Sequence, residues 1–131
     1  MTDEDVKLQK VVMTVSFLKQ VPLFKSVPAD FLASLANIIS EKHVYKGEKL
    51  FSQGDAGDSI YVVVEGRVKI LVGGKETALL GPRSHIGEMS LLDGEPRSAT
   101  AVVAEDGRLL RIGAEEFRHL LMSHPGFTMA L

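Results

Sequence analysis

The chain has 131 residues, of which 45% are hydrophobic and 24% charged, a composition typical of a folded globular domain rather than a disordered segment. Fifteen lysines and arginines against seventeen aspartates and glutamates give a net charge of −2, so no excess of positive charge favours a nucleic-acid backbone or an anionic membrane. The absence of cysteine excludes a disulfide framework, a thiolate metal centre and a cysteine nucleophile.

The N-terminal ten residues are acidic and polar, the reverse of a secretory signal peptide. The longest apolar runs span only a few residues, too few to cross a bilayer. A chain without disulfides also fits a reducing compartment. We therefore expect a single cytoplasmic domain over residues 1–131, with no membrane insertion and no direct contact to nucleic acid.

Residues 1–40 have the apolar spacing of two helices. In the first helix, apolar side chains recur every three or four residues at Leu8, Val11, Val12, Val15 and Leu18. A second helix is predicted to start near Ser26, Pro28 and Asp30, which offer a capping oxygen, a preset backbone angle and a negative charge in the first turn. Its apolar face is formed by Phe31, Leu32, Leu35, Ala36, Ile38 and Ile39.

From about residue 41 the apolar period changes to two, which indicates strands. Short strands are predicted at residues 43–45, 50–51, 60–64, 67–70, 77–80, 99–103 and 109–112. Residues 53–58 contain two glycines and form a long turn, and Gly73-Gly74 is a hairpin signal. Short strands separated by glycine turns are typical of a compact antiparallel barrel or roll.

Residues 113–131 return to helical spacing. A helix is predicted to open at Gly113, with Glu115 and Glu116 in its first turn. Its apolar stripe consists of Phe117, Leu120 and Leu121. A further helix is expected to start at Pro125 and is cut off at residue 131.

Residues 85–100 are too apolar in their middle for a surface loop and too short for a full helix. We expect one helical turn at residues 88–92 with Gly87 at its mouth, where unpaired backbone N–H groups favour an anion. Arg97 follows Pro96 and carries five donors in a rigid fork. Amides and one arginine suit a phosphodiester better than a triphosphate, for which a Walker loop is absent. Glu88 would accept a hydrogen bond from a ribose hydroxyl, so the segment predicts a nucleotide with one phosphodiester.

Residues 87–92 (Gly-Glu-Met-Ser-Leu-Leu) and 96–100 (Pro-Arg-Ser-Ala-Thr) resemble the phosphate-binding cassette of cyclic nucleotide-binding domains, the family of the bacterial catabolite activator and the regulatory subunits of cAMP-dependent kinase. The similarity extends from about residue 22 to about residue 122. It implies an antiparallel β-roll (a double-stranded β-helix, jelly-roll-like) of about eight strands with N- and C-terminal helices. The roll would span residues 41–112 with the cassette at 86–100, between N-terminal helices at 1–40 and a C-terminal helix at 113–131 that ends in the start of a truncated lid helix.

The resemblance also implies roles for individual residues. Gly87 would offer its amide to the ligand, Glu88 would accept from the ribose 2′-hydroxyl, and Arg97 would pair with the exocyclic phosphate oxygens. Ser98 would add its hydroxyl and amide, with the Ala99 amide nearby. The expected ligand-binding residues are Gly87, Glu88, Met89, Ser90, Arg97, Ser98 and Ala99. Candidate pocket walls are Val62, Val64, Ile86, Met89 and Leu91.

The function implied by the resemblance is a non-enzymatic sensor that binds a cyclic nucleotide, with cAMP favoured over cGMP. Ligand capture would move the terminal helices and act on an effector domain or partner protein outside this chain. Ser98 leaves the choice between the two nucleotides open, and a homodimer is compatible with the sequence. The alternative is a ligand-free roll that serves as a protein-interaction or dimerisation module through its helices. Separately, Glu88 and Arg97 could be explained as a structural ion pair beneath a loop, and Ser98 as a cap of the next strand.

The sequence offers no candidates for catalysis or metal binding. Asp55 and Asp58 lack the further carboxylates of a calcium loop and are interpreted as turn residues. Neither Ser90 nor Ser98 lies in a nucleophile elbow. Metal-ligand spacing is also absent among His43, His85, His119 and His124. A metal cupin and a phosphodiesterase are therefore excluded, and no cofactor is expected besides the nucleotide ligand.

Overall fold

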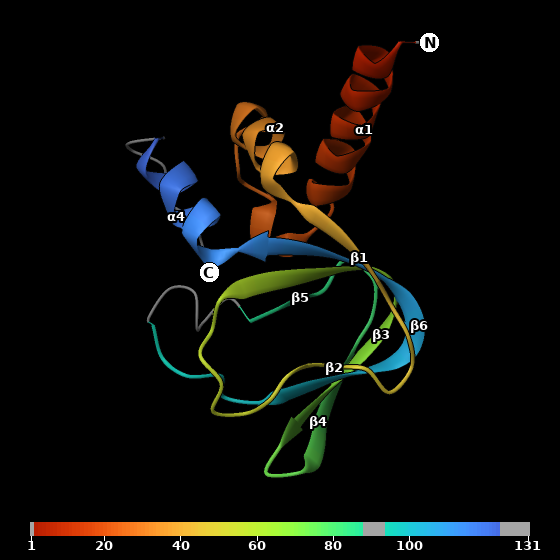
Figure 1. The fold of residues 1–131 in the computed structure, drawn as a ribbon, viewed down its shortest axis with the longest axis vertical. Coiled ribbons are helices and arrows are strands. Elements are labelled where there is room, and N and C mark those ends of the chain that lie inside the picture. Colours follow the sequence, from red (N-terminus) through yellow and green to blue (C-terminus); the bar gives the residue numbers. More distant parts are fainter. Residues whose placement is uncertain (1, 88–93, 124–131) are drawn as a thin grey trace.

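The computed structural model describes residues 2–87 and 94–123. Its elements are α1 (Asp3–Leu18), the 3₁₀ helix η1 (Pro22–Phe24), α2 (Ala29–Ile38), β1 (Ser40–Val44), β2 (Lys49–Phe51), β3 (Ser59–Val72), β4 (Lys75–Leu80), β5 (His85–Ile86), β6 (Thr100–Gly113) and α4 (Ala114–Met122). The described strands form one six-stranded antiparallel sheet, and α1, α2 and α4 gather at one end of it (Figure 1). The predicted fold class, mainly β with helices before and after the strands, is confirmed.

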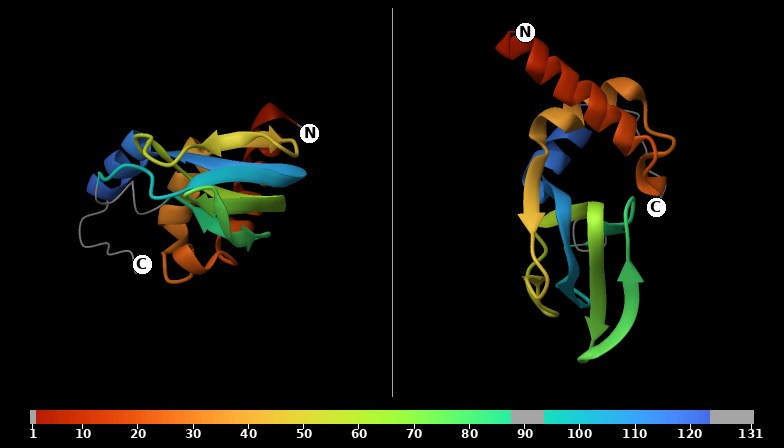
Figure 2. Two further views of the ribbon diagram at one scale, coloured as in Figure 1. Left: turned by 90° about the horizontal axis from the view of Figure 1, so that it is seen from below. Right: turned by 90° about the vertical axis from the view of Figure 1, so that its right-hand side faces the viewer.

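Two long strands, β3 and β6, carry the sheet. They pair with each other along most of their length, and β6 also pairs with β1 and β2. β4 and β5 pair with opposite ends of β3, so the sheet curls as Figure 2 shows. The sequence predicted two short strands in place of each long one. The described strands number six instead of about eight because both long strands continue through the expected breaks.

Gly66 and Gly107 allow the two long strands to stay paired where they bend. The register between β3 and β6 shifts three times between Val63 and Val68. Gly66 has a φ of +89°, and a Cβ there would lie 2.8 Å from the backbone oxygens of Glu105 and Asp106, while a Cβ on Gly107 would collide with the backbone of Glu65. These glycines therefore form an irregularity within continuous strands, as bulges do, and do not end them.

Helix α1 forms where the sequence predicts it, but only its C-terminal part is packed. Leu18 is fully buried, whereas Leu8 is 64% exposed and Val12 is also exposed. Figure 1 shows the reason, since the N-terminal half of α1 projects beyond α2. A capping box formed by Thr2 and Asp5 closes this free end.

Helix α2 also forms as predicted, with a different start. Pro28 occupies the N-cap position, and no side-chain hydrogen bond caps the helix. The capping role expected of Ser26 is therefore wrong. Asp30 lies in the first turn, where its negative charge suits the helix dipole.

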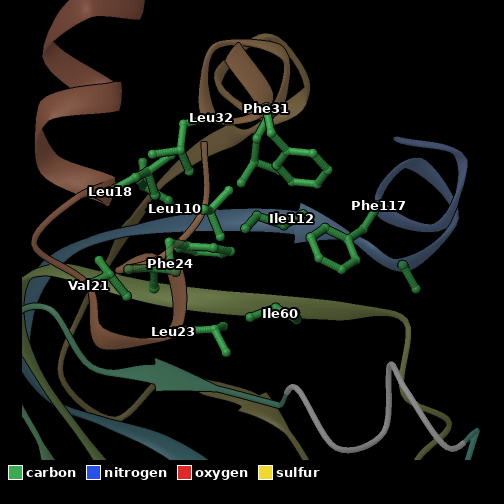
Figure 3. Packing of buried hydrophobic residues seen from close by; sticks show 14 residues of the cluster. Leu18, Val21, Leu23, Phe24, Phe31, Leu32, Ile60, Leu110, Ile112 and Phe117 are labelled. Atoms are coloured by element: carbon green, nitrogen blue, oxygen red, sulfur yellow. The ribbon is translucent and has the colours of Figure 1, made fainter. Parts of the chain in front are cut away.

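The buried apolar residues form two clusters because successive side chains of β3 point to opposite faces. The helix-face cluster, shown in Figure 3, comprises Leu18, Val21, Leu23, Phe24, Val27, Phe31, Leu32, Leu35, Ile60, Val62, Leu110, Ile112, Ala114 and Phe117. Within it the rings of Phe31 and Phe117 meet edge to face at 6.4 Å and tie α2 to α4. The interior cluster comprises Val44, Tyr61, Val63, Val68, Ile86, Ala101, Val103 and Leu109. No described helix is long and apolar enough to cross a membrane.

Two tight turns join the strands beside the interior cluster. Gly73 and Gly74, with φ of +59° and +81°, connect β3 to β4 and confirm the predicted hairpin. In the turn before β5, Ser84 N–H donates to the Gly81 oxygen at 3.2 Å, and Pro82 precedes Arg83, whose φ is +73°. This is the pattern of a type II turn, in which the position of Arg83 favours glycine.

We predict that Arg83→Gly stabilises the protein by about 0.5–1 kcal/mol, because relief of the left-handed backbone outweighs the greater freedom of glycine in the unfolded chain. Urea denaturation measures the change. Lys25→Gly is the matched control, since Lys25 is an exposed cation with an ordinary φ of −57°, and there glycine lowers stability. Equal loss of stability in both variants would contradict the interpretation of strain.

Candidate functional site

Arg97 is a charged side chain enclosed by the fold, with only 4% of its surface exposed. Its Nη2 donates to the Ser59 backbone oxygen at 2.8 Å, and its Nη1 donates to the Gly87 backbone oxygen at 3.1 Å. Its Nε is buried and has no hydrogen-bond partner among the described residues. A buried polar group normally has a hydrogen-bond partner. The Nε of Arg97 is therefore available to donate to a group that the described residues do not supply.

The charge of Arg97 is only loosely compensated. Burial lowers the pKa of its guanidinium below the ordinary value, and the carboxylate of Asp58 acts in the opposite direction. That carboxylate lies 3.8 Å from Nη2, is 76% exposed, and is shared with Arg111 at 3.6 Å. An exposed, shared carboxylate is a weak partner. Among the described residues the charge of Arg97 is therefore only weakly compensated, and the guanidinium suits an anion.

The Arg97 guanidinium lies over an aromatic ring. Its Cζ is 4.1 Å from the ring centroid of Phe51, at the end of β2. That ring stacks on Tyr61 of β3, with centroids 6.3 Å apart and planes inclined by 28°. Tyr61 belongs to the interior cluster, so the ring beneath the guanidinium packs against the core of the sheet.

Gly87 closes the site at the end of β5. It has a φ of +95°, and a Cβ there would collide with the Arg97 guanidinium. Glycine is required on both grounds, since other residues resist this backbone conformation and would displace the cation. The carbonyl of Gly87 accepts the Nη1 hydrogen bond, so Gly87 and Arg97 hold each other in place.

The turn between β2 and β3 holds the backbone of Arg97. The Arg97 N–H donates to the Asp55 oxygen at 2.7 Å, and the Gly54 N–H donates to the Arg97 oxygen at 2.8 Å. The carboxylate of Asp55 accepts from the Ser52 N–H at 2.9 Å, as expected of a turn residue. No cluster of three or more metal-ligating side chains occurs among the described residues.

Of the other predicted site residues, the structure describes only some. Ser98 is exposed and Ala99 half-buried, directly between Arg97 and β6, and Ile86 lies in the interior cluster. The expected ligand contacts Glu88, Met89 and Ser90, the wall residue Leu91 and the helical turn at 88–92 fall outside the described residues, as does the helix expected from Pro125.

Val62 and Val64 are not brought to Arg97. Val62 belongs to the helix-face cluster and Val64 packs against it, whereas Tyr61 and Val63 lie on the side of β3 that carries the site. The prediction that Val62 and Val64 line the nucleotide pocket stays a prediction, and the structure places both valines on the face of β3 that packs against the helices. The sequence could not distinguish the two faces because positions 60–64 are all apolar and both faces of this strand segment are buried.

Sequence reasoning also missed three contacts of Arg97, namely Ser59, Phe51 and the carboxylate of Asp58. They lie about forty residues away along the chain and meet it only because the turn at 53–58 folds onto the segment before β6. A backbone oxygen and an apolar ring carry no sequence signal for such a role.

Comparison with known proteins matches residues 41–124 to the model of the cyclic nucleotide-binding domain. A cAMP-dependent protein kinase regulatory subunit of Eremothecium gossypii is 36% identical over 77% of this chain and 22% of its own length. The cyclic AMP receptor protein of Thermus thermophilus is 36% identical over 82% and 52%, and a cyclic nucleotide-gated potassium channel of Rhizobium etli is 32% identical over 93% and 34%. The chain thus spans between about a fifth and a half of these relatives.

Solved structures share the fold. The regulatory domain of Toxoplasma gondii PKA, crystallised with cAMP, superposes with a TM-score of 0.82 at 24% identity, covering 91% of this chain and 48% of that one. The regulatory subunit of a cAMP-independent protein kinase A from Trypanosoma brucei gives 0.80 at 20% identity, covering 88% and 43%. With the family model matched over most of the β-roll and over its enclosed arginine, the chain belongs to the cyclic nucleotide-binding domain family.

Proposed function

We propose that this domain is a cAMP sensor whose phosphate site is centred on Arg97. The observation that carries the proposal is the enclosed guanidinium with an Nε that lacks a partner among the described residues. Relatives named for cAMP, in a kinase regulatory subunit and in a receptor protein, support this choice of nucleotide. Two of the matched relatives are named as regulatory subunits of a kinase, and by the same reasoning the proposed role is binding without catalysis.

A cyclic phosphodiester fits the chemistry of the site. It carries one negative charge, which would neutralise the loosely compensated cation, and its two exocyclic oxygens suit the fork of a guanidinium. The carbonyls of Ser59 and Gly87 already fix the orientation of that fork, so little conformational freedom remains to be lost on binding. The expected roles of Glu88 at the ribose and of the Gly87, Ser98 and Ala99 groups at the phosphate complete the proposed site.

Asp58 offers a route from the site to the helices. Its carboxylate faces Arg97, and its backbone oxygen accepts the N–H of Ala114, the first residue of α4, at 2.8 Å. An anion that competes with this carboxylate for the guanidinium would alter the contacts of Asp58, and with them the hydrogen bond at the start of α4. Ligand affinity that differs between two arrangements of α4 would then drive a switch, which an effector outside the chain would sense.

A ligand-free interaction module is the second candidate, and the apolar surface of α1 favours it. The exposed apolar side chains of α1 are Val6, Leu8, Val12 and Met13. A cavity of about 450 Å³ between α1 and the sheet is lined in part by Val6, Met13, Phe17, Val64 and Leu110. The cAMP-independent relative shows that the fold can occur in a protein that cAMP does not regulate. Absence of binding to cAMP and cGMP at millimolar concentration would favour this candidate.

We predict that Arg97→Ala weakens cAMP binding by about tenfold or more, because it removes charge-assisted hydrogen bonds to the phosphate. Arg97→Lys recovers little of the loss, since a point charge cannot replace the planar fork. Isothermal titration calorimetry with cAMP and cGMP measures both effects and the preference between the nucleotides. Thermal shift provides a second readout because a bound ligand stabilises the folded state.

Arg67→Ala is the matched control for charge. Arg67 is an exposed arginine of β3 whose Nε pairs with Glu105 at 3.1 Å, and its removal leaves cAMP affinity unchanged. An unchanged affinity in Arg97→Ala, or an equal loss in both variants, would defeat the assignment of the phosphate site.

We predict that Gly87→Ala also weakens cAMP binding by about tenfold or more, because its Cβ displaces the guanidinium that binds phosphate. Gly47→Ala separates this effect from backbone strain. Gly47 has a nearly equal φ of +93°, but no atom lies within 4 Å of the added Cβ. Both variants therefore lose stability in denaturation experiments, whereas only Gly87→Ala loses affinity in calorimetry. The same affinity in the two variants would show that the contact between Gly87 and Arg97 does not serve binding.

A further inference from the structure

We propose that Phe51 is a positioning residue for the ligand, and that its ring holds the Arg97 guanidinium in place by a cation–π contact. The inference rests on the proposed function, because its consequence is measured as nucleotide affinity. It adds a residue of β2, outside the segment 86–100, to the determinants of phosphate binding.

The Phe51 ring lies beneath the Arg97 guanidinium and is itself packed against the sheet. The guanidinium carbon lies 4.1 Å from the centroid of the Phe51 ring, within the range of a strong cation–π interaction. The stack on Tyr61 backs the ring, and Tyr61 is buried in the middle of the sheet between β5 and β6. Phe51 itself pairs with Ala101 of β6. The ring is therefore held by two strands, and it supports the guanidinium that lies over it.

The chemical advantage of a ring is that it stabilises the cation without consuming an N–H donor. The two backbone carbonyls of Ser59 and Gly87 take one N–H bond each. A carboxylate in the place of the ring would compensate the charge fully, but it would bind the remaining donors and repel a phosphate. The ring face offers a negative quadrupole only, so Nε and the remaining Nη hydrogens stay available for an anion.

An aliphatic side chain would fill the same space without this property. Phe51→Leu retains the apolar contact with the interior cluster but removes the quadrupole. We expect cAMP affinity to fall by about two- to thirtyfold, the range that corresponds to cation–π energies of exposed and desolvated pairs. Phe51→Tyr keeps an aromatic face and restores affinity to near that of the wild type.

A double-mutant cycle and a control variant distinguish an effect of Phe51 through the guanidinium from a purely structural role. If Phe51 acts through the guanidinium, Phe51→Leu weakens cAMP binding in the wild-type background but not in Arg97→Ala. Leu80→Ala is the control, since Leu80 packs against the same interior cluster from β4. We expect it to lower the melting temperature without lowering affinity.

A measurement without ligand tests the geometry itself. In the NMR spectrum of the free protein, the Nε–H proton of Arg97 should be shifted upfield by the ring current of Phe51 and protected from solvent exchange by burial. The upfield shift should disappear in Phe51→Leu and persist in Phe51→Tyr. Identical Arg97 resonances in the wild type and Phe51→Leu would overturn the proposed contact.

The outcomes separate the two proposals. A wild-type protein that binds neither cAMP nor cGMP refutes the proposed function, and the role of Phe51 in binding fails with it. A wild-type protein that binds, together with a Phe51→Leu variant of equal affinity, refutes only the role of Phe51. An equal loss in the wild-type and Arg97→Ala backgrounds also refutes it, because the effect then does not pass through the guanidinium.

Discussion

The burial of one positive charge constrains everything around it. A guanidinium withdrawn from water needs compensation, and here it comes from two backbone carbonyls, one exposed carboxylate and one aromatic ring. These contacts require particular backbone conformations. Gly87 must have a left-handed φ, and the turn at 53–58 must fold back onto the backbone of Arg97. The sheet can therefore be viewed as the frame that brings β2, the start of β3 and the end of β5 to a single side chain.

The amount of the fold that could be predicted from the sequence depended on which signals are local. The hairpin at Gly73-Gly74 and helix α4 after Gly113 were predicted correctly, because turn glycines and helical spacing act over a few residues. The continuity of β3 through Gly66 was not, since a glycine within a strand has the same sequence signal as a glycine that ends one. Only the opposing Gly107, forty-one residues away, shows that the close approach of two strands is the reason for it.

The candidate site was predictable in its centre and not in its surroundings. Arg97 and Gly87 stood out because a glycine, a proline and an arginine at this spacing have few structural explanations, and the structure does bring the two residues into contact. Val62 and Val64, two of the predicted pocket walls, lie on the opposite face of β3 from Tyr61 and Val63, and an all-apolar strand carries no alternation from which to choose between the faces. Phe51 could not be found at all, because a ring beneath a cation has the same sequence signal as a ring in a core.

The two buried faces of β3 have a consequence for the proposed sensor. The strand contributes Tyr61 to the cluster under Arg97 and Ile60 to the cluster under the helices, so both clusters pack on the same backbone. Close-packed interiors transmit displacement and do not absorb it. At its first residue, β3 supplies the Ser59 oxygen that holds the guanidinium, and the preceding Asp58 oxygen holds the start of α4. The strand end at Asp58 and Ser59 is therefore shared by the site and by the start of α4.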